Sequence, residues 1–188
     1  MNKFLLVIGL AAAQPVADRN EPLKFKSLEL ADAPWGCAVT ELHIPKGFKF
    51  RHCERLNAVA WQGQVQGHNT VVTCSFTPLS KKLWEISLIV GDEVELPKAK
   101  QTYLSMKSTL VSNYGRPNNS YEFCSGPYYI GDGHETEALQ TGNYNLSDFW
   151  MRLPKARIGM AVTPEGWTCI TFESKVFRSL EKQETLNQ

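Results

Sequence analysis

The sequence lacks an excess of charge of either sign. It has 20 Lys and Arg residues against 19 Asp and Glu residues, a formal net charge of +1 at pH 7. Proteins that bind nucleic acids through the phosphate backbone usually carry a clear basic excess. The composition therefore argues against a nucleic-acid partner. With 43% hydrophobic and 21% charged residues, the 188-residue chain can bury a sizeable core, which excludes a wholly disordered protein.

Several motifs of common enzyme classes are also absent. The sequence contains no G-x-S-x-G nucleophile elbow, no G-x-G-x-x-G fingerprint and no P-loop, which argues against hydrolases of that type and against nucleotide use. There is no C-x-x-C and no Cys/His pair at zinc-finger spacing, so a structural zinc site is not predicted. The sequence predicts no catalytic residue, no metal and no cofactor, and it leans away from an enzyme.

Long hydrophobic runs are scarce, and the one at the N-terminus is short. Phe4–Ala13 is an apolar run of ten residues that follows Lys3 and ends in small residues. As a helix it would rise about 15 Å, about half of a bilayer core, so it suits a signal peptide better than a membrane span. We predict that residues 1–13 are a signal peptide; a buried N-terminal strand or helix is the alternative. No later run is long enough to span a membrane.

Removal of the signal would change the charge and the compartment. Cleavage before Gln14 removes Lys3, which leaves 19 basic and 19 acidic residues. The mature protein is therefore predicted to be neutral, without a transmembrane segment, and secreted or periplasmic.

Five cysteines lie after the predicted signal, at Cys37, Cys53, Cys74, Cys124 and Cys169. The number is odd, so at least one thiol stays outside any intramolecular disulfide. Most of them sit in apolar or alternating segments, which favours buried thiols that behave as small hydrophobic residues. One or two disulfides are the alternative, because export permits them. A catalytic thiol is a third reading, but the cysteines have no recognisable catalytic flank.

The hydrophobic pattern alternates between strand and helix periods. The clearest helix is predicted at 97–114, where Ala99, Tyr103, Met106 and Leu110 form one apolar stripe and Gly115 ends it. A shorter helix is predicted at 33–44, with Asp32 as its N-cap. Strands are predicted at 23–26, 48–56, 58–66, 70–77, 83–90, 121–125, 148–153, 156–163 and 166–173, with an irregular loop at 131–147 and a short terminal helix at 177–188.

This order predicts an α+β fold made of two tandem units, each a helix with a four-stranded antiparallel sheet. The first half would span residues 20–96 and the second 97–176, followed by a polar tail at 177–188. The two sheets could join into one continuous sheet with the helices on one face, since an amphipathic sheet needs a cover on its apolar side. A broad sheet face would then stay exposed.

The loop at 131–137 has the densest set of candidate metal ligands. It contains His134 with the carboxylates of Asp132, Glu135 and Glu137. Oxygen ligands at this density suit calcium, but the spacing is not that of an EF-hand, so a solvated acidic loop is the simpler interpretation. A periplasmic enzyme or metal-dependent protein that uses this loop is one alternative function.

Some segments resemble an uncharacterised family of secreted, periplasmic proteins of gut-dwelling anaerobic bacteria. The resemblance rests mainly on the order of its segments, which are Leu23–Lys26, Lys46–Phe48, Trp61–Gly67, Leu83–Val90, Leu110–Pro117 and Ile158–Phe172. The family implies export but no particular activity. The predicted architecture is also similar to the tandem repeats of beta-lactamase inhibitor protein. That likeness suggests an inhibitor of a secreted or envelope enzyme as another alternative.

Aromatic residues supply the remaining functional signal. Trp, Tyr and Phe make up 11% of the chain. Aromatic and Arg side chains are common anchors of binding surfaces, although most aromatics pack in cores. The candidate binding residues are Trp61, Tyr128, Tyr129, Trp150 and Arg152. The leading hypothesis is a secreted, non-enzymatic binding or interaction module for an unknown protein or carbohydrate.

Overall fold

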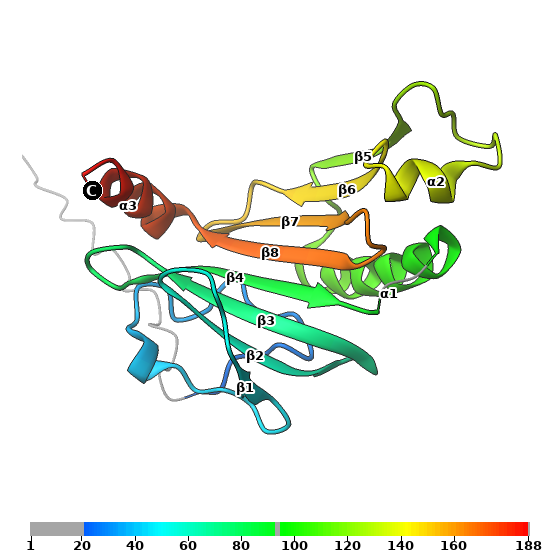
Figure 1. Cartoon of the computed structure of the whole chain (residues 1–188). Coiled ribbons are helices and arrows are strands. Elements are labelled where there is room, and N and C mark those ends of the chain that lie inside the picture. The colour runs from blue at the N-terminus through cyan, green and yellow to red at the C-terminus, as the bar shows by residue number, and fades with distance from the viewer. Residues whose placement is uncertain (1–20, 93–94, 188) are drawn as a thin grey trace, which may run out of the picture.

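The computed structural model describes residues 21–92 and 95–187. The predicted signal peptide at 1–13 lies outside the described residues. Within these ranges the chain forms an α+β fold around one open antiparallel sheet of eight strands, as Figure 1 shows. The predicted class, an antiparallel sheet with helices, is confirmed.

The sheet consists of two four-stranded meanders that meet edge to edge. Its order is β1-β2-β3-β4-β8-β7-β6-β5, and every neighbouring pair is antiparallel. The strands are β1 (Lys49–Arg51), β2 (Ala58–Val65), β3 (His68–Phe76), β4 (Leu83–Val90), β5 (Asn119–Cys124), β6 (Tyr144–Trp150), β7 (Ala156–Val162) and β8 (Thr168–Ser174). At the junction Leu88 of β4 lies opposite Ile170 of β8, so the apolar sides of both meanders form one surface.

Three α-helices accompany the sheet: α1 (Leu96–Tyr114), α2 (Glu135–Gln140) and α3 (Lys175–Leu186). The helix α1 buries the predicted stripe of Ala99, Tyr103, Met106 and Leu110. It ends where Gly115 has a φ of +76°, in a region that favours glycine. None of the helices in the described ranges is long and apolar enough to cross a membrane.

The predicted helix at 33–44 is wrong. This stretch contains only a 3-10 turn, Val39–Glu41. The reason is long-range backbone pairing, because the N–H of Gly36 donates to the carbonyl of Leu83 and the N–H of Leu83 donates to that of Cys37. Gly36 has a φ of +82°, and a Cβ there would lie 2.1 Å from the ring of Phe177. A helix would break these contacts.

The predicted strand at 23–26 is also wrong, since none of these residues is in a strand and a turn begins at Phe25. They nevertheless belong to the core, with Phe25, Leu28 and Leu30 each 0% exposed. The first meander is therefore covered by an irregular segment, residues 21–45, rather than by a helix.

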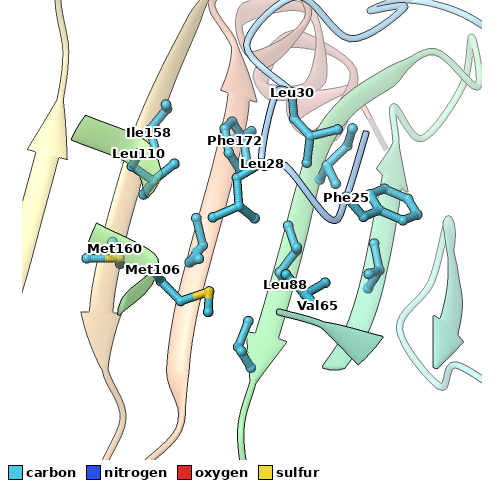
Figure 2. Packing of buried hydrophobic residues seen from close by; sticks show 14 of the residues in the cluster. Phe25, Leu28, Leu30, Val65, Leu88, Met106, Leu110, Ile158, Met160 and Phe172 are labelled. Atoms are coloured by element: carbon cyan, nitrogen blue, oxygen red, sulfur yellow. The ribbon is translucent and has the colours of Figure 1, made fainter. Parts of the chain in front are cut away.

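The core lies on one face of the sheet, which we call the covered face. Residues 21–45 and α1 pack side by side on it, behind the sheet in Figure 1. Figure 2 shows Leu28 beside Phe172, and Met106 and Leu110 of α1 against Met160 and Ile158 of β7. One continuous core thus joins the two meanders.

Several of the remaining elements differ from the predictions in their bounds, although β4 has the predicted bounds, 83–90. The strand expected at 48–56 is shorter, since β1 spans Lys49–Arg51, and β6 begins at Tyr144 rather than at residue 148. The loop expected at 131–147 contains α2. Short elements of this kind depend on tertiary contacts, which a local pattern does not encode.

Candidate functional site

The second face of the sheet, which we call the open face, points away from α1 and from residues 21–45. The strand registers assign its side chains. In the first meander they are Gln62, Gln64, Asn69, Val71, Thr73, Glu85, Ser87 and Ile89. In the second they are Tyr121, Phe123, Ser147, Phe149, Arg157, Gly159, Ala161, Cys169, Thr171 and Glu173. Most of these residues are partly or fully exposed.

The open face of the first meander holds a hollow of about 580 Å³, which we call the polar hollow. Its floor includes Gln62, Val71 and Thr73, and residues 51–54 and Trp167 form its walls. The amide and hydroxyl groups of the floor can both donate and accept hydrogen bonds. This hollow therefore suits a polar ligand group, such as a peptide backbone.

The open face of the second meander holds a hollow of about 420 Å³, which we call the apolar hollow. Small side chains leave this space open, above all Gly159 and Ala161 on β7. A Cβ at Gly159 would lie 3.5 Å from the ring of Phe149, at ordinary van der Waals distance, so this ring lies directly beside the small residues of β7. Phe149 and Met151 line the hollow on the β6 side.

Two glutamates face each other where the meanders join. Glu85 of β4 lies directly opposite Glu173 of β8, and both line the apolar hollow. Like charges in this position repel, so a buried member needs a cationic or hydrogen-bonding partner. Glu85 is 7% exposed, and its Oε1 accepts from Arg55 Nη1 at 2.8 Å and from Ser75 Oγ at 3.0 Å. These two contacts fix the acidic end of the hollow.

Aromatic side chains extend the apolar hollow towards the outer strand β5. The rings of Tyr121 and Phe149 make an edge-to-face contact with their centroids 6.1 Å apart. Tyr121 is 48% exposed, Phe123 47% and Met151 40%. Such large half-exposed side chains are typical of interaction surfaces.

The structure does not bring the five predicted binding residues together. Trp61 and Trp150 lie on the covered face. Their partners in the neighbouring strands, Val72 and Ile158, belong to the core on that face. Trp150 is 2% exposed, and its indole N–H donates to the carbonyl of Gly115 at 2.8 Å. It is a core residue with almost no surface for a ligand.

Of the other three predicted residues, two are exposed. Tyr129 is 71% exposed, Arg152 is exposed just after β6, and Tyr128 packs partly against the core. Strand parity could have corrected the placement of Trp61, because Gln62 and Gln64 alternate with it along β2. Polar residues at those positions put the tryptophan on the apolar side.

Three of the five thiols do not resemble catalytic nucleophiles. The five cysteines form no disulfide in the structure. Burial raises the pKa of the Cys74, Cys124 and Cys169 thiols. A catalytic cysteine requires the opposite shift, since the thiolate is the nucleophile.

Two of the three carboxylates of the 131–137 loop accept hydrogen bonds from nearby backbone N–H groups, and the third, Glu137, lies 3.5 Å from Nδ1 of His134. Asp132 accepts hydrogen bonds from the N–H groups of Tyr129 and His134, which lower the pKa of its carboxyl group. Glu135 accepts from the N–H of Gly131 at 2.6 Å. Within residues 21–92 and 95–187, no three His, Cys, Asp or Glu side chains converge as metal ligands would.

Sequence and structure comparisons identify no relative. The chain matches no protein-family model, no curated protein and no solved structure. Any functional proposal therefore rests on the geometry of the open face.

Proposed function

We propose that the chain is an exported, non-enzymatic binding module and that its open face binds a polypeptide partner. One observation carries this proposal: the sheet buries a single core on its covered face, while its open face is hollowed over both meanders. An antiparallel sheet can leave one face in water, but that face is then usually polar. The half-exposed side chains of Tyr121 and Phe123 and the apolar hollow depart from that pattern.

The chemistry of the two hollows favours a polypeptide. The apolar hollow accepts an aliphatic or aromatic side chain between Phe149 and the small residues of β7. The polar hollow offers Gln62 and Thr73 to the backbone of the same partner. Interfaces combine an apolar anchor with surrounding hydrogen bonds in this way.

The test uses peptides selected from a random library displayed on phage, with the full chain immobilised. The affinity of a selected peptide is then measured for the wild type, for Ala161→Arg in the apolar hollow and for Ser112→Arg, an exposed site on α1. We expect Ala161→Arg to weaken binding by about tenfold or more, equal to ~1.4 kcal/mol, because the added side chain fills the hollow. Ser112→Arg should leave binding unchanged.

Three results would contradict the proposal. The selected peptides could bind both variants equally well, which would place their site elsewhere. An oligosaccharide panel could bind the open face where no peptide does, which would make the partner a carbohydrate. The wild type could turn over a panel of hydrolase substrates, with loss of turnover on substitution of a cysteine or histidine.

The export part of the proposal has its own test. Mass spectrometry of the protein recovered outside the cytoplasm should find an N-terminus at Gln14. A chain that keeps Met1 in every cell fraction would refute the signal peptide.

We also propose that the two meanders are tandem units, with boundaries near residues 20–96 and 97–176. The support is the strand order of the sheet. Each unit is a four-stranded meander, and the last strands of the two units, β4 and β8, meet at the junction. The covers differ, since among the described residues the long helix α1 belongs to the second unit and the first unit has only a 3-10 turn. Expression of residues 97–176 alone should give a partly folded, aggregation-prone fragment, because half of the shared core would be missing.

A further inference from the structure

The two outer strands of the sheet differ in length and charge. β1 has three residues, Lys49–Arg51, whereas β5 has six, Asn119–Cys124. Natural proteins protect sheet edges with short strands, charged side chains or prolines. β1 has the first two of these protections. β5 contains neither Lys, Arg nor Pro, and its first five residues are exposed.

Three edge-to-edge contacts between two copies of the chain are conceivable, and two of them are unfavourable. Every face-matched register of β1 with a second β1 places Lys49 or Arg51 opposite another basic residue, which is destabilising. Pairing of β1 with β5 leaves a free β5 edge on one copy and a free β1 edge on the other. Further copies could then add at both ends, and the assembly would not close. Pairing of β5 with β5 closes after two copies and brings no basic residues together.

The hydrogen-bonding groups of β5 restrict the register of such a pair. The N–H of Ser125 donates to the carbonyl of Asn143 on the β6 side. Since these bonds alternate along an antiparallel pair, Tyr121 and Phe123 also direct their backbone groups to β6. Ser120, Glu122 and Cys124 therefore direct theirs to the outer edge, where a second strand can bind them.

Two face-matched registers align five of the six residues of β5 with the same strand of the second copy, whereas every other one aligns three or fewer, and charge selects between these two. In one, Glu122 lies opposite Glu122 of the second copy, and the two carboxylates repel. In the other, Glu122 lies opposite Ser120 of the second copy, and Tyr121 lies on the two-fold axis. Within each copy Glu122 keeps its ion pair with Lys100, at 2.7 Å.

We infer that two copies of the chain pair through β5, antiparallel and with Tyr121 on the two-fold axis. The result is one continuous sheet of two eight-stranded halves. On its open face the two Tyr121 rings meet between the two Phe149 rings, so the apolar hollows of both copies share one aromatic strip. Aromatic cross-strand pairs of this kind stabilise sheets.

The area of the contact predicts a weak dimer. Tyr121 and Phe123 each expose nearly half of their surface, or roughly 100 Å² each for side chains of this size. Two copies would bury at most about 400 Å² of aromatic surface in addition to the paired backbones. That total is at the lower end of specific interfaces, below about 1,200 Å². The dimer should therefore dissociate on dilution.

Cross-linking tests both the contact and its register. In the Tyr121→Cys variant the two new thiols would lie on the axis, on Cα atoms about 4.5 Å apart, which a disulfide can span. In the matched Phe123→Cys variant the two sites would be four residues out of register, about 13 Å apart. Mild oxidation should give a covalent dimer with Tyr121→Cys and not with Phe123→Cys or the wild type. Equal cross-linking of both variants, or none, would overturn the inference.

Sedimentation over a range of concentrations provides the second test. The wild type should shift from monomer towards dimer as the concentration rises, and Tyr121→Lys should stay monomeric because two ammonium groups would meet on the axis. The matched control is Phe50→Lys on β1, where Phe50 is 71% exposed. A wild type that stays monomeric, a dimer that survives Tyr121→Lys, or its loss in Phe50→Lys would each contradict pairing through β5.

Discussion

The two halves of the sheet share a topology but are built differently on both faces. Each is a four-stranded antiparallel meander. The first is covered by the irregular residues 21–45 and carries the polar hollow, whereas the second is covered by the 19-residue helix α1 and carries the apolar hollow. The same strand plan thus accepts two kinds of cover, provided that each supplies buried side chains. The difference on the open face gives the molecule one polar and one apolar end.

The covers are held by different polar contacts. In the second half the buried carboxylate of Asp148 accepts from Tyr103 Oη at 2.6 Å and from Lys107 Nζ at 2.7 Å, both on α1. In the first half the hydroxyl of Tyr114 donates to the carbonyl of Leu28 and accepts from the N–H of Leu30, both at 2.8 Å. Side chains of α1 therefore anchor both covers, which links the stability of the two halves.

The largest predicted effects come from leucines in the two covers. Leu28 and Leu110 are both 0% exposed, one in the irregular segment and one in α1. We expect Leu28→Ala and Leu110→Ala each to lower the free energy of unfolding by about 2–5 kcal/mol, since each leaves a cavity in the shared core. Urea denaturation measures the effect, and Leu104→Ala, at a site 59% exposed on α1, is the control. If Leu28→Ala cost no more than this control, residues 21–45 would not be a true cover.

A smaller loss is expected from the contact that joins α1 to the second half. Asp148→Asn keeps the shape of the side chain but removes its charge beside Lys107. Hydrogen bonds to charged groups contribute about 1.5–3 kcal/mol, so we expect a loss of unfolding free energy in that range. Asp92→Asn is the matched control, because Asp92 is exposed and accepts one hydrogen bond, from Asn69. Equal effects of the two substitutions would show that Asp148 does not anchor the helix.

The sequence predicted one of these halves better than the other, for physical reasons. The stripe of α1 is local, so its period alone predicted the helix, and the alternation in 83–90 predicted β4 with the bounds it has. The cover of the first half depends on long-range contacts, such as the backbone pairing of Gly36 and Cys37 with Leu83. No local pattern encodes these contacts, and the prediction of a helix there was wrong.

The candidate site was less accessible from sequence than the fold. Its clearest determinants are small side chains, Gly159 and Ala161, which leave space beside Phe149. Small residues carry no chemical signature, whereas of the two tryptophans predicted to bind, Trp150 lies in the core and Trp61 packs against it. Strand parity predicts the covered face for Trp61, because Gln62 and Gln64 alternate with it, but Trp150 stands between Phe149 and Met151 and has no such polar pattern beside it.

The smallest predicted effect is a pH dependence at the outer edge of the second half. Hydrogen bonds from Lys100 and Tyr144 lower the pKa of the Glu122 carboxyl group below its ordinary value of 4.5. Because folding lowers this pKa, the stabilisation is present above the ordinary value and is lost as the pH falls through the folded value. Glu122 is half-exposed, so its contribution should be only a few tenths of a kcal/mol. Unfolding of Glu122→Gln between pH 6 and about pH 3 should show a correspondingly shallower loss than the wild type, and an identical pH profile would refute this.

The most direct test of the central claim is a titration that follows the methionine methyl groups by NMR. Met151 lines the apolar hollow, while Met106 of α1 is buried on the covered face at 0% exposure. Addition of a selected peptide should shift the Met151 methyl resonance in a saturable manner and leave that of Met106 nearly unchanged. Saturable binding that leaves the Met151 resonance unmoved would contradict the assignment of the open face as the binding surface.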